Sequence, residues 1–231
     1  MSHSRRRPGA MGSTVGTLLA AGVLAGLAIV VGNAIARAQL PVLDRTTIPH
    51  VAYQAYVSAS AQAPTVANGC AVDWTIIAGL GRVESRHGLL DGGHDISIAG
   101  TVTPVIRGPQ LDGTGGTRPI ADTDGGAFDG DPIWDRAMGP LQFIPTTWRE
   151  LARDGNGDGV AEPDNLYDAA LTAVAHLCLR QPGDYSDRAQ LRRALLGYNA
   201  SGRYADQVLA WIDRYRAAEV EQVVDLPGEA A

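Results

Sequence analysis

The chain has 231 residues, a formal net charge of −6 and 45% hydrophobic residues. This length accommodates an export segment and one globular domain with a well-filled core. All 19 basic residues are arginine, and they are outnumbered by 25 acidic residues. Because an acidic surface repels nucleic acids and anionic lipids, we exclude DNA and RNA as partners.

The first 38 residues have the features of an export segment. Arg5, Arg6 and Arg7 form a positive region, and residues 15–36 carry no charge. The tripeptide 36–38, Ala-Arg-Ala, is typical of a signal-peptide cleavage site. The apolar stretch is also long enough to remain as an anchor with its arginines on the cytoplasmic side. We therefore expect residues 1–38 to be a signal peptide or an N-terminal membrane anchor. Residues 39–47 would form a linker, and the rest of the chain would lie outside the cytoplasmic membrane.

The remainder of the chain is dominated by helical patterns. The spacing of apolar residues predicts helices over residues 49–62, 74–87, 166–179, 187–196 and 204–221, with a further helix beginning near 145. Pro64 is expected to end the first helix, and Asp73 and Gly88 to bound the second. Between 89 and 136 Gly, Asp, Thr and Pro dominate, with β-prone pieces at 96–98 and 101–106. We predict a mainly α domain over 48–222 with an irregular, partly β insertion, followed by a flexible tail over 223–231.

Glu84 is the residue most suited to acid–base chemistry. At about 100° per residue, Ile77 and Leu80 lie on its side of the helix, whereas Arg82 and Arg86 lie almost opposite. Burial without a cationic partner raises the pKa of a carboxyl group, which a general acid requires near neutral pH. From this position alone, a buried glutamate that only bonds a neighbouring helix remains the alternative.

Three short segments carry a resemblance to a known family. Helix 74–87 ends in Glu-Ser-Arg-His-Gly, residues 139–145 read Gly-Pro-Leu-Gln-Phe-Ile-Pro, and residues 198–201 read Tyr-Asn-Ala-Ser. In this order they resemble the lytic murein transglycosylases, most closely the membrane-bound lytic transglycosylase B group. The resemblance implies a lysozyme-like, SLT-type helical fold with Glu84 as the catalytic residue. It places in the sugar-binding cleft Gly139, Leu141 (where the family usually has Met), Gln142, Phe143, Tyr198 and Asn199. Tyr198 is expected within hydrogen-bonding reach of Glu84 or the sugar, and Asp131 and Trp134 near the cleft entrance.

Residues 154–160 have the spacing of a calcium-binding loop. Oxygen-bearing side chains occupy the first, third and fifth positions, a glycine the sixth, and Val160 can offer its carbonyl at the seventh. The twelfth position holds Asn165 in place of the usual bidentate Glu. The resembled family has a longer loop closed by a later Asp, which implies a structural Ca²⁺ bound by Asp154, Asn156, Asp158, the Val160 carbonyl and Asp168. A solvated turn is the alternative, and no organic cofactor is expected.

Cys70 and Cys178 are the only cysteines in the chain. An exported domain favours a disulfide between them, worth about 4–5 kcal/mol in the chain-entropy model. Two small buried hydrophobic residues are the alternative. Two cysteines without clustered histidines make a poor zinc site.

The resemblance implies cleavage of the bond between N-acetylmuramic acid and N-acetylglucosamine in peptidoglycan glycan strands, with a 1,6-anhydromuramoyl product. A hydrolytic muramidase is the first alternative, with a second carboxylate drawn from Asp122, Asp124, Asp129, Asp131 and Asp135. A non-catalytic peptidoglycan-binding scaffold is the second. His87 lies close to Glu84 in sequence, but such a histidine is more often a structural hydrogen-bonding residue.

Overall fold

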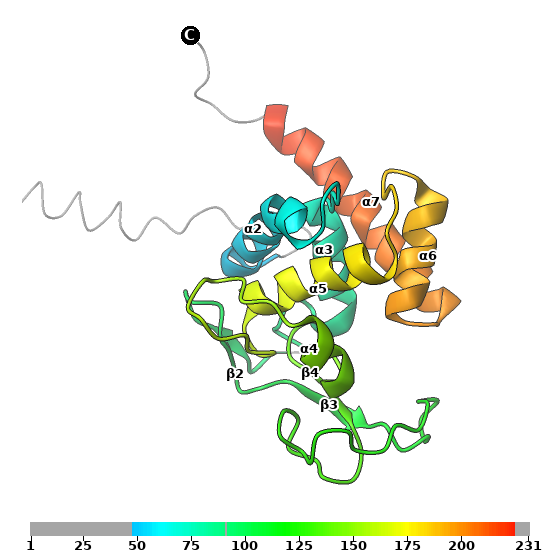
Figure 1. Ribbon diagram of the computed structural model, residues 1–231. Coiled ribbons are helices and arrows are strands. Elements are labelled where there is room, and N and C mark those ends of the chain that lie inside the picture. The colour runs from blue at the N-terminus through cyan, green and yellow to red at the C-terminus, as the bar shows by residue number, and fades with distance from the viewer. Residues whose placement is uncertain (1–47, 91, 225–231) are drawn as a thin grey trace, which may run out of the picture. The chain divides into compact units, whose positions relative to one another are not determined.

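The computed structural model describes residues 48–90 and 92–224 (Figure 1). These residues belong to one compact unit. The predicted export segment, the linker and the tail beyond residue 224 lie outside the described residues. Within the described part of the chain, no helix has the length and hydrophobicity required to cross a bilayer.

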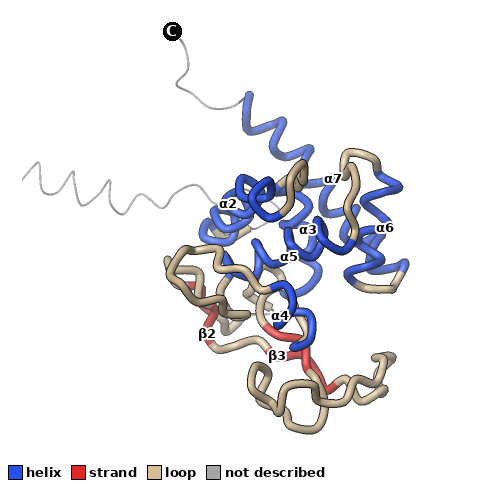
Figure 2. Tube along the Cα trace, viewed as in Figure 1, coloured by secondary structure: helices blue, strands red, loops and turns tan. Residues whose placement is uncertain are grey.

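Helices dominate the described residues, and the strands are few and short (Figure 2). In chain order the elements are α2 (His50–Val66), α3 (Trp74–Ser85), β1 (Asp95–Ile96), β2 (Val102–Thr103), β3 (Arg107–Gln110), β4 (Arg136–Met138), α4 (Pro145–Leu151), α5 (Leu166–Arg180), α6 (Arg188–Tyr198) and α7 (Gly202–Val224). The predicted mainly α class with an irregular, partly β insertion is confirmed.

Helix α5 lies at the centre of the domain. Its residues are buried on every face from Leu166 to Cys178, with Tyr167 the single partly exposed position. A helix that is buried on every face requires neighbours on all sides. Helix α2 packs along α5, and α3 packs between α2 and α7. The helix that carries Glu84 is therefore held in the core by elements from both ends of the domain.

Several helix bounds differ from the sequence prediction: α6 ends at Tyr198 and not near 196, and α7 spans Gly202–Val224 and not 204–221, so the first residues of the predicted tail are helical. Two further differences have a clear physical reason. Helix α2 continues to Val66 with Pro64 inside it, so the predicted end at residue 62 is wrong. In the last turn, proline removes only one hydrogen bond and the chain need not continue as a helix, so its cost is small. Helix α3 ends at Ser85, before the predicted His87, because Arg86 adopts the left-handed conformation with φ 54°. Its predicted N-cap is confirmed, since the Asp73 carboxylate accepts a hydrogen bond of 3.0 Å from the Thr75 N–H.

The insertion between α3 and α4 contains two small antiparallel sheets. Strands β1 and β2 overlap the segments predicted to be β-prone, with Ile96 opposite Val102. The second sheet pairs β3 with β4, with Gln110 opposite Arg136, and was not predicted. Strand β3 reads Arg-Gly-Pro-Gln, a composition that disfavours strands, so this pairing depends on long-range contacts rather than local propensity.

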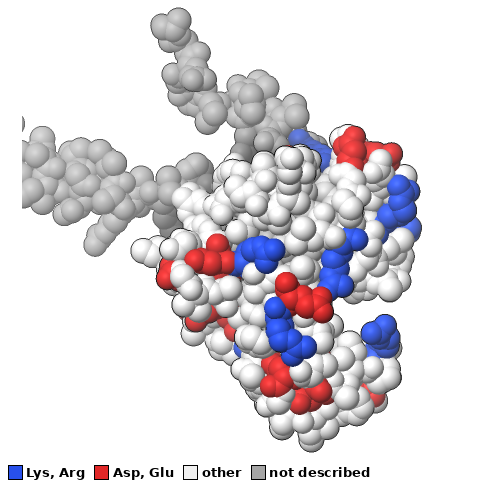
Figure 3. All heavy atoms as spheres, in the orientation of Figure 1, with Lys and Arg blue, Asp and Glu red and all other residues white. Residues whose placement is uncertain are grey.

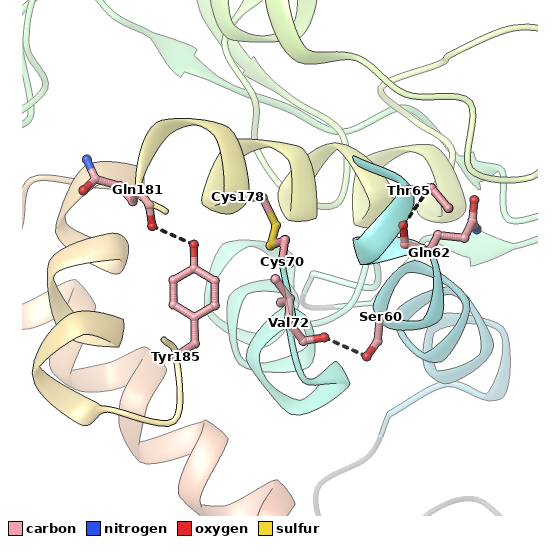
Figure 4. The surroundings of a disulfide bond; sticks show 8 residues. All are labelled: Ser60, Gln62, Thr65, Cys70, Val72, Cys178, Gln181 and Tyr185. Carbon is pink, nitrogen blue, oxygen red and sulfur yellow. Dashed lines mark hydrogen bonds between the residues drawn. A yellow bond between two sulfur atoms is a disulfide. The ribbon is translucent and has the colours of Figure 1, made fainter. Parts of the chain in front are cut away.

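A disulfide joins Cys70 to Cys178, as predicted, with their Cα atoms 5.9 Å apart (Figure 4). It links the connection between α2 and α3 to the last turns of α5. Nearby, Ser60 Oγ donates a hydrogen bond of 2.7 Å to the Val72 carbonyl, again joining α2 to the start of α3. The chain just before α3 is therefore joined to α2 by this hydrogen bond and to α5 by the disulfide.

Candidate active site

Glu84 lies on the inner face of α3, as the helical spacing predicted. Ile77 and Leu80 on the same side are fully buried. Arg82 is partly exposed and Arg86 is exposed on the other side. The Glu84 side chain itself is partly buried, so solvent and a ligand can reach it. This confirms that the carboxyl group shares the apolar side of its helix.

Tyr204, at the start of α7, is the hydrogen-bond partner of Glu84. Its hydroxyl donates to Glu84 Oε1 at 2.5 Å. Burial raises the pKa of the Glu84 carboxyl to about 7, although the hydrogen bond from Tyr204 acts in the opposite direction. A carboxyl group with this pKa is about half protonated at neutral pH, so it can both give and take a proton. Burial and the charge of Glu84 raise the pKa of Tyr204 well above its usual value, which keeps its hydroxyl a donor.

The end of α3 is fastened to the segment 139–143. Ser85 Oγ donates a hydrogen bond of 2.6 Å to the Pro140 carbonyl and accepts one of 2.7 Å from the Gly88 N–H. Gly139 has φ +68°, and a Cβ there would lie 1.8 Å from the Pro163 carbonyl oxygen. Only glycine fits this close approach, so Gly139 acts through the backbone by placing the segment beside Glu84.

The structure places the side chains of the other expected cleft residues in different surroundings. The Leu141 side chain is fully buried in the core, so Leu141 offers the site only its carbonyl, which accepts a hydrogen bond of 2.9 Å from Tyr198. The Phe143 ring lies 5.6 Å from the Tyr198 ring. Gln142, with φ 53°, donates from Nε2 to the Gly139 carbonyl at 2.8 Å. The hydroxyl of Tyr204, and not that of Tyr198, thus contacts Glu84. The Tyr198 hydroxyl instead bonds the segment 139–143.

Two pockets meet at Tyr198. One, of about 330 Å³, is lined by Gln142 and Phe143 among others, and the second, of about 610 Å³, by Asn199. Burial and the charge of Glu84 raise the pKa of Tyr198 well above its usual value. Of the expected cleft residues, four therefore line two pockets that share Tyr198, and Glu84 lines neither of these two pockets.

Asp131 and Trp134 lie in the insertion but line neither pocket. The Asp131 carboxylate accepts hydrogen bonds from Gln110 Nε2 at 2.7 Å and Arg136 Nε at 2.8 Å. It also accepts from the backbone N–H groups of Ile133 and Trp134. These bonds, first that from Gln110, lower the pKa of Asp131 and indicate that it organises the loop.

The remaining acidic residues of the insertion also bond within it. Oxygen atoms of Asp122, Asp124 and Asp135 lie within 4.8 Å of one another, a convergence that sequence reasoning missed. Asp135 is fully buried and accepts hydrogen bonds from the backbone and side chain of Thr123. Asp129 accepts from the Asp131 and Arg136 N–H groups. In the structure these carboxylates shape the loop.

His87 is fully buried and structural. Its Nδ1 lies 3.0 Å from the Tyr56 hydroxyl and its Nε2 lies 3.0 Å from the Tyr215 hydroxyl. Burial and the nearby Arg82 lower the pKa of His87 to about 3, so the ring is neutral at physiological pH. A Cβ at Gly81 would lie 2.2 Å from the Tyr56 hydroxyl, which explains the glycine beside this network. The two tyrosines lie far from His87 in sequence, and no local pattern identifies them.

The expected calcium loop has side chains with oxygen atoms that could bind a cation. The Asp154 carboxylate accepts hydrogen bonds from the Gly157 and Gly159 N–H groups at 2.7 and 2.8 Å. Asp168 is buried, accepts from the Gly155 and Glu162 N–H groups, and has its pKa raised by burial. The carboxylates of this loop do not form one of the described groups gathered within 4.8 Å. The donors thus fit a hard cation in chemical type, and a cation beside Asp168 would stabilise its buried charge.

No protein-family model matches this chain, and no curated protein matches it. Two solved structures are similar to it. One is the Escherichia coli lytic transglycosylase Slt35 in complex with calcium, with 16% identity, a TM-score of 0.46, and 75% of this chain and 77% of that chain covered. The other is Slt35 in complex with bulgecin A, with 16% identity, a TM-score of 0.43, and 83% and 84% covered.

Proposed function

We propose that this protein is an exported lytic transglycosylase of the lysozyme-like, SLT-type fold, acting on peptidoglycan glycan strands. The observation that carries the proposal is a single partly buried acid, Glu84, whose pKa is raised to about 7. The end of its helix is hydrogen-bonded to the segment 139–143, part of which lines a pocket with aromatic and amide side chains. Aromatic faces and amides suit the apolar faces and hydroxyl groups of sugars. The order of the three motifs along the chain supports the same family.

In the proposed reaction Glu84 acts first as an acid. It protonates the oxygen that joins C1 of N-acetylmuramic acid to N-acetylglucosamine, and the C1–O bond breaks. The resulting carboxylate then takes the proton of the muramoyl C6 hydroxyl, whose oxygen bonds to C1. Glu84 is protonated again, and the strand ends in a 1,6-anhydromuramoyl residue without consuming water. The attacking hydroxyl belongs to the same sugar, so proximity supplies much of the acceleration.

The surroundings of Glu84 favour this route over hydrolysis. A hydrolase of the usual kind requires a second carboxylate beside the scissile bond. Among the described residues, the Glu84 carboxyl group has a hydrogen bond with Tyr204 and none with another carboxyl group. The five candidate aspartates of the insertion accept hydrogen bonds within it. A non-catalytic scaffold would have no need of an acid with such a pKa.

We further propose that Gln142, Phe143, Tyr198 and Asn199 bind the glycan. A structural Ca²⁺ would be held by Asp154, Asn156, Asp158, the Val160 carbonyl and Asp168, where it would join α4 to α5 without touching the scissile bond.

Digestion of purified peptidoglycan, followed by mass spectrometry of the muropeptides, tests the proposed function. The protein from residue 39 onward should release anhydromuramoyl products, and Glu84→Gln should release none while remaining folded. Reducing-end products would indicate hydrolysis. Binding without release by either protein would indicate a scaffold.

A further inference from the structure

An ion pair joins the insertion to the loop before α5 (residues 152–165). Arg107 Nη1 donates a hydrogen bond of 2.8 Å to Asp164 Oδ1, across 57 positions of sequence. In Figure 3, acidic and basic side chains lie next to one another at several places on the viewed face, and exposed pairs of this kind contribute little. The pair of Arg107 and Asp164 differs from these, because its side chains are only 21% and 14% exposed. Removing one partner of a largely buried pair is costly, since the other charge is left without compensation.

Both residues of this pair also bond the backbone around them. The Asp164 carboxylate accepts a hydrogen bond of 3.3 Å from the Ile106 N–H, and its carbonyl accepts one of 2.9 Å from the Val102 N–H. The Arg107 guanidinium donates to the Ile106 carbonyl at 2.8 Å and to the Phe128 carbonyl at 3.0 Å. The pair therefore holds together the loop before α5, the start of β3 and a further loop of the insertion.

The segment 139–143 is fastened at the same place. The Ile106 carbonyl, which accepts from Arg107, also accepts a hydrogen bond of 2.9 Å from the Gly139 N–H. The Pro163 carbonyl, in the loop before α5, lies so close to Gly139 that a Cβ there would be 1.8 Å from its oxygen. Gly139 thus contacts both of the backbone segments that the ion pair joins.

The segment 139–143 in turn contacts the residues around Glu84. Ser85, the next residue along the chain, donates a hydrogen bond of 2.6 Å from Oγ to the Pro140 carbonyl. A second carbonyl of the segment accepts a hydrogen bond of 2.9 Å from Tyr198, whose pKa is raised in part by the charge of Glu84. The segment therefore connects the ion pair to the end of the helix that carries Glu84.

We propose that Arg107 and Asp164 are positioning residues for the proposed reaction, and that together they fix the segment 139–143 against the end of α3 and keep water away from Glu84. The inference rests on the proposed function, because it takes Glu84 as the reacting acid. Neither residue bonds Glu84, so both act through the segment. A displacement of about 1 Å far from the reacting atoms can reduce a rate roughly 100-fold.

Three variants of the full chain test the proposal: Arg107→Gln, Asp164→Asn and the double variant. Arg188→Gln is the matched control, because Arg188 forms an ion pair with Asp213 in which both side chains are exposed. The measurements are kcat and KM for release of anhydromuramoyl products, NMR titration of a ¹³C-labelled Glu84 carboxyl, and urea unfolding. Where a variant does not fold, Arg107→Lys replaces it, since lysine keeps the charge but not the planar set of donors.

We expect each single variant to lower kcat roughly tenfold or more, and the double variant to lower it no further, because the two residues act as a unit. The control should leave kcat unchanged. The pKa of Glu84 should fall from about 7 toward 4.5 in both single variants, because burial is the larger cause of its rise and water would now reach the carboxyl group. Arg107→Lys should give a smaller change in the same direction.

The direction of the two pKa shifts separates positioning from a direct charge effect. Loss of a cation by itself would raise the pKa of Glu84, and loss of an anion by itself would lower it. A fall in both Arg107→Gln and Asp164→Asn therefore supports positioning. Shifts of opposite sign would overturn the proposal, and so would a loss of stability with kcat and the pKa of Glu84 unchanged.

The positioning role and the proposed function fail in different ways. Anhydromuramoyl release by the intact protein that neither single variant changes would retain the proposed function and reject the positioning role. A fall in the pKa of Glu84 in both variants of a protein that releases no anhydromuramoyl product would retain the positioning of Glu84 and reject the proposed reaction.

Discussion

The Tyr204 hydroxyl donates a hydrogen bond of 2.5 Å to Oε1 of Glu84, across 120 positions of sequence. It brings the start of α7 to the face of α3 that carries Glu84. The bond favours the charged carboxylate, whereas burial favours the protonated acid, and burial is the larger effect. The balance leaves the pKa of Glu84 near the pH at which one group must serve as acid and then as base.

Removing the Glu84 charge should stabilise the fold at high pH. The pKa of Glu84 is raised in the folded protein, so the unfolded chain loses the proton first, and stability falls as pH rises from about 4.5 through about 7. Glu84→Gln escapes this loss and should be more stable by up to about 3 kcal/mol at pH 9, with no difference at pH 4. Urea unfolding of both proteins across this pH range measures it. A constant difference at all pH values would mean that the pKa is not raised.

Tyr204→Phe should move the alkaline limb of the pH–activity profile to higher pH. The lost hydrogen bond lowers the pKa of Glu84 in the intact protein, so its removal allows burial to raise that pKa further. Tyr185→Phe is the control, because the Tyr185 hydroxyl bonds the Gln181 carbonyl, away from Glu84. NMR titration of a ¹³C-labelled Glu84 carboxyl in both variants gives the shift directly. A fall in pKa in Tyr204→Phe would show that Tyr204 does not act through this bond.

His87→Ala should affect stability and not the chemical step. It leaves a cavity and two buried tyrosine hydroxyls without their partner, which costs roughly 3–5 kcal/mol. His50→Ala, at an exposed position, is the matched control. Because the pKa of His87 is lowered, intact protein should also lose stability as pH falls from about 6.5 toward 3, and the variant should lose less. Lost activity with unchanged stability would instead assign His87 a role in catalysis.

Calcium should raise the melting temperature if the loop at 154–168 binds it. At about 100 times Kd, a single site stabilises the fold by about 2.7 kcal/mol. Asp154→Asn should abolish the rise, since Asp154 organises the loop through the Gly157 and Gly159 N–H groups. Asp122→Asn tests the second acidic cluster. A rise lost in Asp122→Asn and kept in Asp154→Asn would place the ion in the insertion.

Local chemistry explains what could be predicted from the sequence. The helical period placed Glu84 on the apolar side of α3, and Asp73 marked its start, because both features depend on residues within a few turns. The disulfide followed from there being one pair of cysteines. Gln142, Phe143 and Tyr198 line one pocket. They were expected in one cleft because their motifs resemble those of the lytic transglycosylases, and no spacing of residues predicts it.

What the sequence could not predict depends on contacts between distant segments. Tyr204 could not be identified as the partner of Glu84, because nothing in the sequence around it shows that its hydroxyl meets that carboxyl group. The burial of Leu141 depends on how the segment 139–143 folds back between helices. Strand β3 has a sequence that disfavours strands and exists through its pairing with β4. These features arise from contacts between distant segments in the packed core, and the spacing of apolar residues within one helix does not predict such contacts.

Digestion in H₂¹⁸O tests the central claim most directly, namely that Glu84 alone catalyses attack by the substrate's own C6 hydroxyl. Peptidoglycan cut by the enzyme should yield anhydromuramoyl fragments with no ¹⁸O at the new end, and the Glu84→Gln protein should yield none. One ¹⁸O per cleavage, on a reducing muramoyl end, would contradict the claim. It would require a water nucleophile and a second base.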